Sequence, residues 1–215
     1  AFCCEKGIFT LTSLCHLSNS GDTTPILRGG VALTYSDICE AVEKVKKKYC
    51  ETDPFMLCKT MGIILLFQPL GKDPDAVKGF FLECKRIRTI TVNSDLPYVI
   101  QKIIVAHELG HAVLHRDRGI YAFHEITMYD ESSVMEKEAN LFAAEFYLDD
   151  DEVLDTLNAD TTFFTAAASL RVPMELLDFK FRVMKWKGYK LMEPPIRANS
   201  NFLRDMDVPE NADYC

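Results

Sequence analysis

The stretch His107-Glu108-Leu109-Gly110-His111 constrains this chain more than any other part of it. Residues four apart on an α-helix lie on one face, so His107 and His111 can bind a single metal ion. Glu108 lies about 60° round the helix from His111, within reach of a water on that ion but too far round to be a ligand. The motif therefore predicts a helix that carries a metal site, with Glu108 as a base beside it.

A third ligand is predicted on the next helix, which spans about 136–148. Glu138 lies 27 residues beyond His111, and a carboxylate joined to two histidines leaves the fourth position open, as in catalytic zinc sites. Glu138 shares its helix face with Leu141 and Phe142, apolar surroundings in which a carboxylate needs a partner such as a metal. The spacing therefore favours His107, His111 and Glu138 as the metal ligands.

Two further residues near this motif are weaker ligand candidates. Glu145 shares the face of Glu138 but lies about two turns away. His115 lies about 6 Å further along the helix axis than His111, so it cannot join the same ion without breaking the helix.

Composition narrows the class of protein. The 215 residues are 48% hydrophobic, which is enough for a domain core. The sequence contains no run of about 18 apolar residues, so no membrane-spanning helix is predicted. The net charge of −8 repels the phosphates of nucleic acid, so a protein partner is favoured over direct DNA binding. Residues 1–30 lack the features of a secretory signal, which favours a cytoplasmic protein. The eight cysteines show no CxxC pair and are expected to be reduced, with a second metal site or a redox switch as alternatives.

The hydrophobic pattern predicts helices before and after a small sheet. We expect a helix over 37–49 capped by Ser36, and a short helix from Asp53-Pro54 to Gly62. Strands are expected over 63–68 (buried), 77–82 and 89–92, followed by the motif helix, which Asn93 or Ser94 would cap. The predicted fold class is α+β, mainly helical, with a small three-stranded sheet, mixed or antiparallel.

Three regions are expected along the chain. Residues 1–33 form an N-terminal segment, 34–150 a domain that carries the metal motif, and 151–215 a C-terminal helical extension. Between 161 and 186, two helices separated near Pro173 resemble a helix-turn-helix, with a locally basic face formed by Lys180, Arg182, Lys185, Lys187 and Lys190. This extension either contacts DNA or a repressor, or is simply a helical cap. The connection 116–133 could supply an oxyanion-stabilising group, or be an ordinary surface loop.

The motif at 107–111, together with Glu-Ala-Asn-Leu-Phe-Ala-Ala at 138–144, resembles the ImmA/IrrE family of metallopeptidases over about 36–148. The resemblance implies a gluzincin-like zincin that cleaves helix-turn-helix repressors of prophages, integrative elements or stress genes. It also implies that His107, His111 and Glu138 bind the metal and that Glu108 is catalytic. Phe142 stands where some gluzincins carry an aspartate that orients a ligand, so another group must orient the histidines here.

These observations predict a zinc-dependent endopeptidase, with Mn²⁺ as the alternative metal, that acts on a helix-turn-helix repressor. One rival is a non-catalytic regulatory protein that binds and sequesters the repressor. The intact Glu108 argues against this rival, because a purely structural metal site needs no base. A toxin or antitoxin component that uses the same site is a third possibility.

Overall fold

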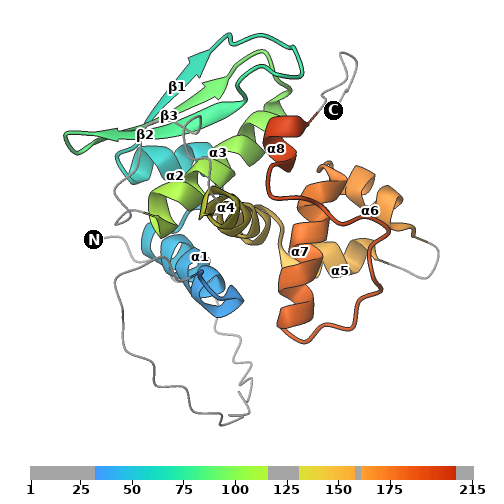
Figure 1. Cartoon of the computed structure of the whole chain (residues 1–215). Helices are drawn as coiled ribbons and strands as arrows, with labels where there is room; N and C mark the ends of the chain where they lie inside the picture. Colours follow the sequence, from blue (N-terminus) through green and yellow to red (C-terminus); the bar gives the residue numbers. More distant parts are fainter. Residues whose placement is uncertain (1–31, 116–130, 158–160, 207–215) are drawn as a thin grey trace. The chain divides into compact units, whose positions relative to one another are not determined.

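The computed structural model describes residues 32–115, 131–157 and 161–206 (Figure 1). The N-terminal segment before residue 32 and most of the predicted loop at 116–133 lie outside the described residues.

A three-stranded mixed sheet is formed by β1 (Ile64–Gln68), β2 (Gly79–Cys84) and β3 (Ile87–Asn93), in the order β1-β3-β2. The central strand β3 pairs with β1 in parallel, with Ile64 opposite Thr89. It pairs with β2 antiparallel, with Gly79 opposite Val92. The sheet and the helices around it confirm the predicted α+β, mainly helical class.

The strand β1 differs from the prediction of a buried strand. It lies at an edge of the sheet, and its residues Ile64, Leu66 and Phe67 are 40–49% exposed. The fully buried residues Ile90 and Val92 lie in β3 instead. An apolar run predicts a strand, but the order of strands in the sheet decides which of them is enclosed.

The described residues form eight helices: α1 (Tyr35–Tyr49), α2 (Pro54–Thr60), α3 (Tyr98–Leu114), α4 (Glu131–Tyr147), α5 (Asp150–Thr156), α6 (Phe163–Ser169), α7 (Met174–Trp186) and α8 (Phe202–Asp205). The motif helix α3 packs against β2, β3 and α2 on one side and against α4 on another. The helix α4 in turn contacts α1 and α7, so it lies between the motif helix and the C-terminal helices (Figure 1). None of the described helices is long and apolar enough to cross a membrane.

The helix caps differ in part from the prediction. The helix α1 begins after Thr34 rather than Ser36, because Thr34 and Asp37 form a reciprocal capping box. The helix α2 starts where it was predicted, and Asp53 caps it by accepting from two backbone N–H groups. The helix α3 starts after Pro97 without a side-chain cap. The predicted cap residue Asn93 instead ties the preceding loop together, with its amide donating to the carbonyl oxygens of Gly71 and Val77.

The motif helix is buried over most of its circumference, with Ile100, Ile103 and Leu109 fully enclosed. Its glycine allows α4 to approach closely. A Cβ atom on Gly110 would lie 3.0 Å from the Cα atom of Ala139 and 3.2 Å from the Cβ atom of Phe142. Gly110 therefore sets the spacing between the two helices that carry the site.

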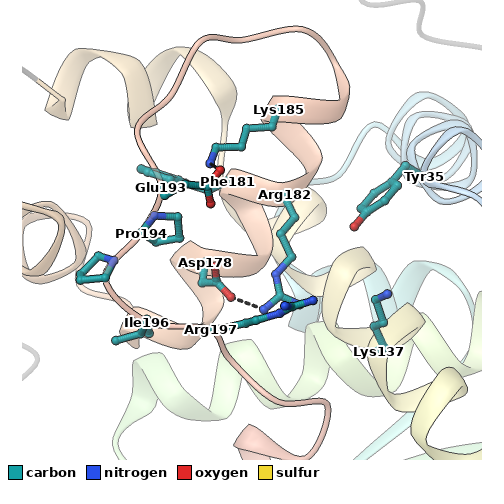
Figure 2. Close-up of a pocket in the computed structure, with 11 residues that line it drawn as sticks. Tyr35, Lys137, Asp178, Phe181, Arg182, Lys185, Glu193, Pro194, Ile196 and Arg197 are labelled. Carbon is teal, nitrogen blue, oxygen red and sulfur yellow. Dashed lines mark hydrogen bonds and ion pairs between the residues drawn. The ribbon is translucent and has the colours of Figure 1, made fainter.

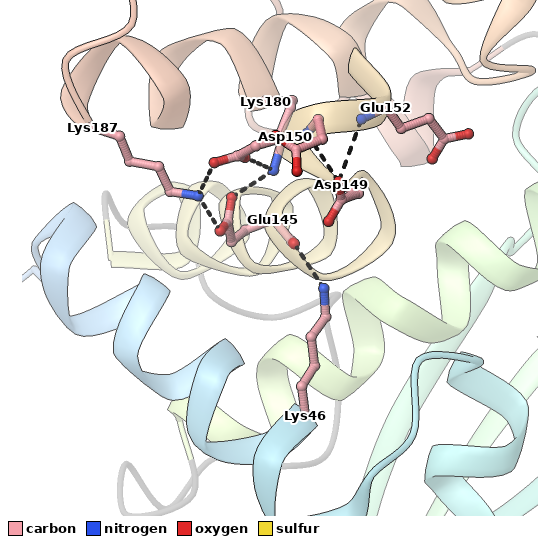
Figure 3. A network of polar contacts seen from close by, with 8 residues as sticks. Lys46, Glu145, Asp149, Asp150, Glu152, Lys180 and Lys187 are labelled. Carbon is pink, nitrogen blue, oxygen red and sulfur yellow. Dashed lines mark hydrogen bonds and ion pairs between the residues drawn. The ribbon is translucent and has the colours of Figure 1, made fainter. Parts of the chain in front are cut away.

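A buried ion-pair network joins α4 to α7 (Figure 3). The ammonium of Lys180, which is 1% exposed, lies 2.8 Å from Glu145 Oε2 and 2.6 Å from Asp150 Oδ1. Lys187 Nζ lies 2.5 Å from Glu145 Oε1 and 2.8 Å from Asp150 Oδ2. Glu145, a weaker ligand candidate from the sequence, therefore serves packing between helices and lies outside the histidine cluster.

The expectation of a basic face on the C-terminal helices is wrong for most of the residues that define it. Lys180 and Lys187 belong to the network just described. Arg182 pairs with Asp178, and Lys185 lies 2.6 Å from Glu193. Sequence proximity groups the positive charges, whereas the fold supplies an acidic partner to four of the five.

Candidate metal centre

The Nε2 atoms of the two motif histidines converge on one point. His107 and His111 lie one turn apart on α3, and both side chains are buried. Their Nε2 atoms are 3.1 Å apart. This convergence is what the four-residue spacing predicts.

The carboxylate that completes the cluster belongs to Glu136 of α4. Glu136 Oε2 lies 3.2 Å from His107 Nε2, and Glu136 Oε1 lies 3.4 Å from His111 Nε2. With metal–ligand bonds of about 2.0–2.1 Å, ligand atoms around a tetrahedral zinc ion lie about 3.3 Å apart. The two imidazole nitrogens and the carboxylate of Glu136 therefore have the spacing and the chemistry of a His₂Glu metal site.

Glu138, which the sequence favours as the third ligand, lies elsewhere in the structure. Its Oε2 atom is 2.9 Å from Nε2 of His115, and its Oε1 atom accepts the backbone N–H of Leu33 at 2.6 Å. Residues two apart on a helix point about 200° away from each other, so Glu136 and Glu138 cannot both face the same two histidines. The structure brings Glu136 to them.

A pattern of small residues in the sequence could have identified Glu136, although the distance from His111 along the sequence could not. Glu136, Ala139 and Ala143 follow one another at three- and four-residue intervals, so they share one face of α4. Ala139 contacts the site of Gly110, which makes this small-residue face the one that meets the motif helix. The acidic residue on that face is the one placed against the histidines.

Glu108 is buried beside the cluster, and one oxygen of its carboxylate lacks a hydrogen-bond partner among the described residues. The side chain is 4% exposed, and its Oε2 atom has no hydrogen-bond partner among the described residues. Leaving a buried carboxylate oxygen unpaired is costly, so such a group points to a ligand, an ion or a water at the site. The residues present therefore fit a metal with a water beside Glu108.

Burial also prepares His111 for metal binding. Removal from water lowers the pKa of its imidazole below the ordinary 6.5, although the carboxylate of Glu136 acts in the opposite direction. A metal binds the neutral ring, because the ligand nitrogen must carry a free lone pair. His111 is therefore held in the form that can coordinate at neutral pH.

A separate cavity of about 610 Å³ lies between α7, the segment that follows it, the start of α1 and Lys137 of α4 (Figure 2). Tyr35 and Lys137 lie on one side of it, and Arg182 and Arg197 on the other. None of the clustered metal-site residues lines it. Lys137 faces this cavity while its neighbour Glu136 faces the histidines, as expected for residues about 100° apart on a helix.

The sequence of this chain is similar to those of known proteins. Residues 58–182, more than half of the chain, match the model of a peptidase family described as the IrrE N-terminal-like domain. The chain is also 32% identical over 146 residues to "Uncharacterized immunity region protein 2" of Bacillus phage phi105, across 68% of this chain and 90% of that protein. No solved structure matches it. The chain belongs to the ImmA/IrrE family of peptidases, as the paired motifs indicated, and a protein is therefore its substrate class.

Proposed function

We propose that this protein is a metal-dependent endopeptidase in which His107, His111 and Glu136 hold the metal. The observation that carries the proposal is the convergence of two imidazole nitrogens and one carboxylate beside a buried glutamate. The two Nε2 atoms are 3.1 Å apart, and each has an oxygen of Glu136 at 3.2 or 3.4 Å. Zn²⁺ is the metal favoured by two imidazoles and one carboxylate, and Mn²⁺ is the alternative. The family match supports the peptidase reaction.

When bound, a divalent ion at this site supplies Lewis-acid polarisation of the scissile carbonyl and lowers the pKa of the attacking water. Glu108 accepts the proton of that water and passes it to the nitrogen of the leaving amine. Its unpaired buried oxygen suits this role, because a carboxylate without a protein partner is available to a water. Glu108 is therefore the residue whose loss should stop cleavage without removing the metal ligands.

We further propose that the substrate is a helix-turn-helix repressor, as the family resemblance implies. The phage relative carries "immunity region" in its name, which agrees with the prophage setting that the resemblance implies. A repressor substrate implies a cytoplasmic enzyme. The net charge of −8 and the internal pairing of most C-terminal basic residues support contact with protein rather than direct contact with DNA.

Mass spectrometry of a repressor encoded beside this gene tests the proposal. The repressor is incubated with the wild-type chain and with Glu108→Gln, each loaded with Zn²⁺ or Mn²⁺. We expect a discrete cut by the wild type and none by the variant, which keeps the ligands but lacks the base. An intact repressor bound tightly by both proteins would favour sequestration instead, and a repressor neither bound nor cut would refute the substrate assignment.

A further inference from the structure

A buried chain of polar contacts runs from the metal cluster to Glu138. The Nδ1 atom of His111 lies 3.0 Å from Nδ1 of His115, and the Nε2 atom of His115 lies 2.9 Å from Glu138 Oε2. His115 is 3% exposed and Glu138 is 2% exposed. Two residues that are not in the metal cluster are therefore connected to one of its histidines, away from solvent.

The direction of each hydrogen bond in this chain follows from the chemistry of the rings. If the Nε2 atom of His111 is the ligand, its neutral ring carries the proton on Nδ1. That N–H must donate to Nδ1 of His115, which then carries its own proton on Nε2. The Nε2–H group of His115 faces a carboxylate, which accepts it. One arrangement of protons satisfies both of these contacts, and it leaves the lone pair of His111 Nε2 directed at the cluster.

The far end of the chain is fixed as well. The other oxygen of Glu138, Oε1, accepts the backbone N–H of Leu33 at 2.6 Å. Each oxygen of the Glu138 carboxylate thus has a donor, and the two donors come from different parts of the polypeptide. Glu138 is held in place by the backbone that precedes α1, and it can in turn hold His115.

We propose that His115 and Glu138 are positioning residues, which orient the ring of His111 and set its tautomer for metal binding. The proposal rests on the proposed function, because it takes His111 as a ligand. Carboxylates that accept a hydrogen bond from a ligand histidine commonly orient its ring, and here the carboxylate acts through a second imidazole.

Metal affinity measured by chelator competition, with Zn²⁺ and separately with Mn²⁺, tests the proposal without any substrate. In Glu138→Gln the amide nitrogen must face either His115 N–H or Leu33 N–H, so one contact becomes donor against donor. We expect this variant and His115→Phe to bind the metal about 10- to 100-fold more weakly. Glu40→Gln, the same chemical change at an exposed glutamate of α1, should leave the affinity unchanged.

A second variant keeps the test valid if Glu138→Gln does not fold. The side chain of His115→Gln has both an acceptor and a donor, so it should bind metal more tightly than His115→Phe. Equal, wild-type affinity in Glu138→Gln and His115→Phe would overturn the proposal.

The comparison with Glu136→Gln separates this proposal from the proposed function. Loss of binding in Glu136→Gln, with only weakened binding in Glu138→Gln, supports both. Loss in Glu138→Gln with retention in Glu136→Gln would make Glu138 the ligand and would overturn the positioning role. Unchanged binding in Glu136→Gln and also in His107→Ala would refute the metal site itself.

Nitrogen NMR of the imidazole rings gives a readout that general destabilisation would not imitate. The chain has five histidines, so the ring signals can be assigned by single substitutions. In the metal-free wild type we expect His111 as the Nδ1–H tautomer and His115 as the Nε2–H tautomer. In folded Glu138→Gln these populations should become mixed. The Nε2–H tautomer at His111 in the wild type would overturn the proposal.

Discussion

Substitution of Gly110 by alanine tests whether the close approach of α3 and α4 builds the site. The added Cβ atom would lie 3.0 Å from the Cα atom of Ala139 and 3.2 Å from its carbonyl oxygen. Both neighbours are backbone atoms, so neither can rotate away. To restore an ordinary contact of 3.4 Å, α4 must move by at least 0.4 Å (3.4 − 3.0). Glu136 lies one turn from Ala139 and would move with the helix.

Two opposing effects set the size of the stability change. Alanine in a helix interior is favoured over glycine by about 1 kcal/mol. Overpacking of a well-packed contact costs about 1–3 kcal/mol, because backbone and side chains must shift. We expect a net loss of about 1 kcal/mol in the free energy of unfolding, which lowers the Tm by about 2–4 °C for a chain of this size.

Urea denaturation of the metal-free protein measures the stability term, and chelator competition measures the site. Metal ligands tolerate displacements of only about 0.2 Å, so Gly110→Ala should also weaken metal binding. Gly110→Ser, with one more heavy atom, should be worse in both measurements. A stability gain of about 1 kcal/mol with unchanged metal affinity would refute the reasoning, since helix propensity would then have acted alone.

Three further predictions concern the rest of the fold. Lys180→Met leaves the buried carboxylates of Glu145 and Asp150 undercompensated, so thermal or chemical unfolding should show a loss of about 3 kcal/mol; a change under 1 kcal/mol would contradict the role of this ion pair. Burial alone would raise the pKa of Asp150, but hydrogen bonds and charge from the neighbouring lysines outweigh it and hold the pKa below 3.8. A carboxyl whose pKa is depressed by folding stabilises the fold at pH values above its pKa in the unfolded chain, and this stabilisation is lost as the pH falls. The difference in the free energy of unfolding between the wild type and Lys180→Met should therefore narrow below about pH 4; a difference that is constant from pH 7 to pH 3 would contradict it. Burial raises the pKa of Cys58 to about 12, so iodoacetamide at pH 8 should label the exposed Cys84 and leave Cys58 unmodified in the folded protein; equal labelling would show that Cys58 is not enclosed.

The sequence by itself determined the class of protein and half of the candidate site. The interval between His107 and His111 fixes their common helix face, because one turn of α-helix is a local property. Glu108 follows from the same helix geometry. The three strands and the two C-terminal helices were also predictable from apolar runs and turn residues, and their ends moved by at most two residues. The division of the chain near residue 150 stays a prediction.

The tertiary structure decided which carboxylate joins the histidines and what the other one does. Glu136 and Glu138 belong to one helix and differ in sequence position by two, and only the rotation of α4 about its axis separates their roles. That rotation is set by the packing of Ala139 against Gly110, a contact between residues far apart in the sequence. Likewise, charge pattern could not show that Lys180 is buried, because its partners come from α4 and α5. Local periodicity determines which residues share a face of a helix, and long-range packing determines which face meets the neighbouring helix.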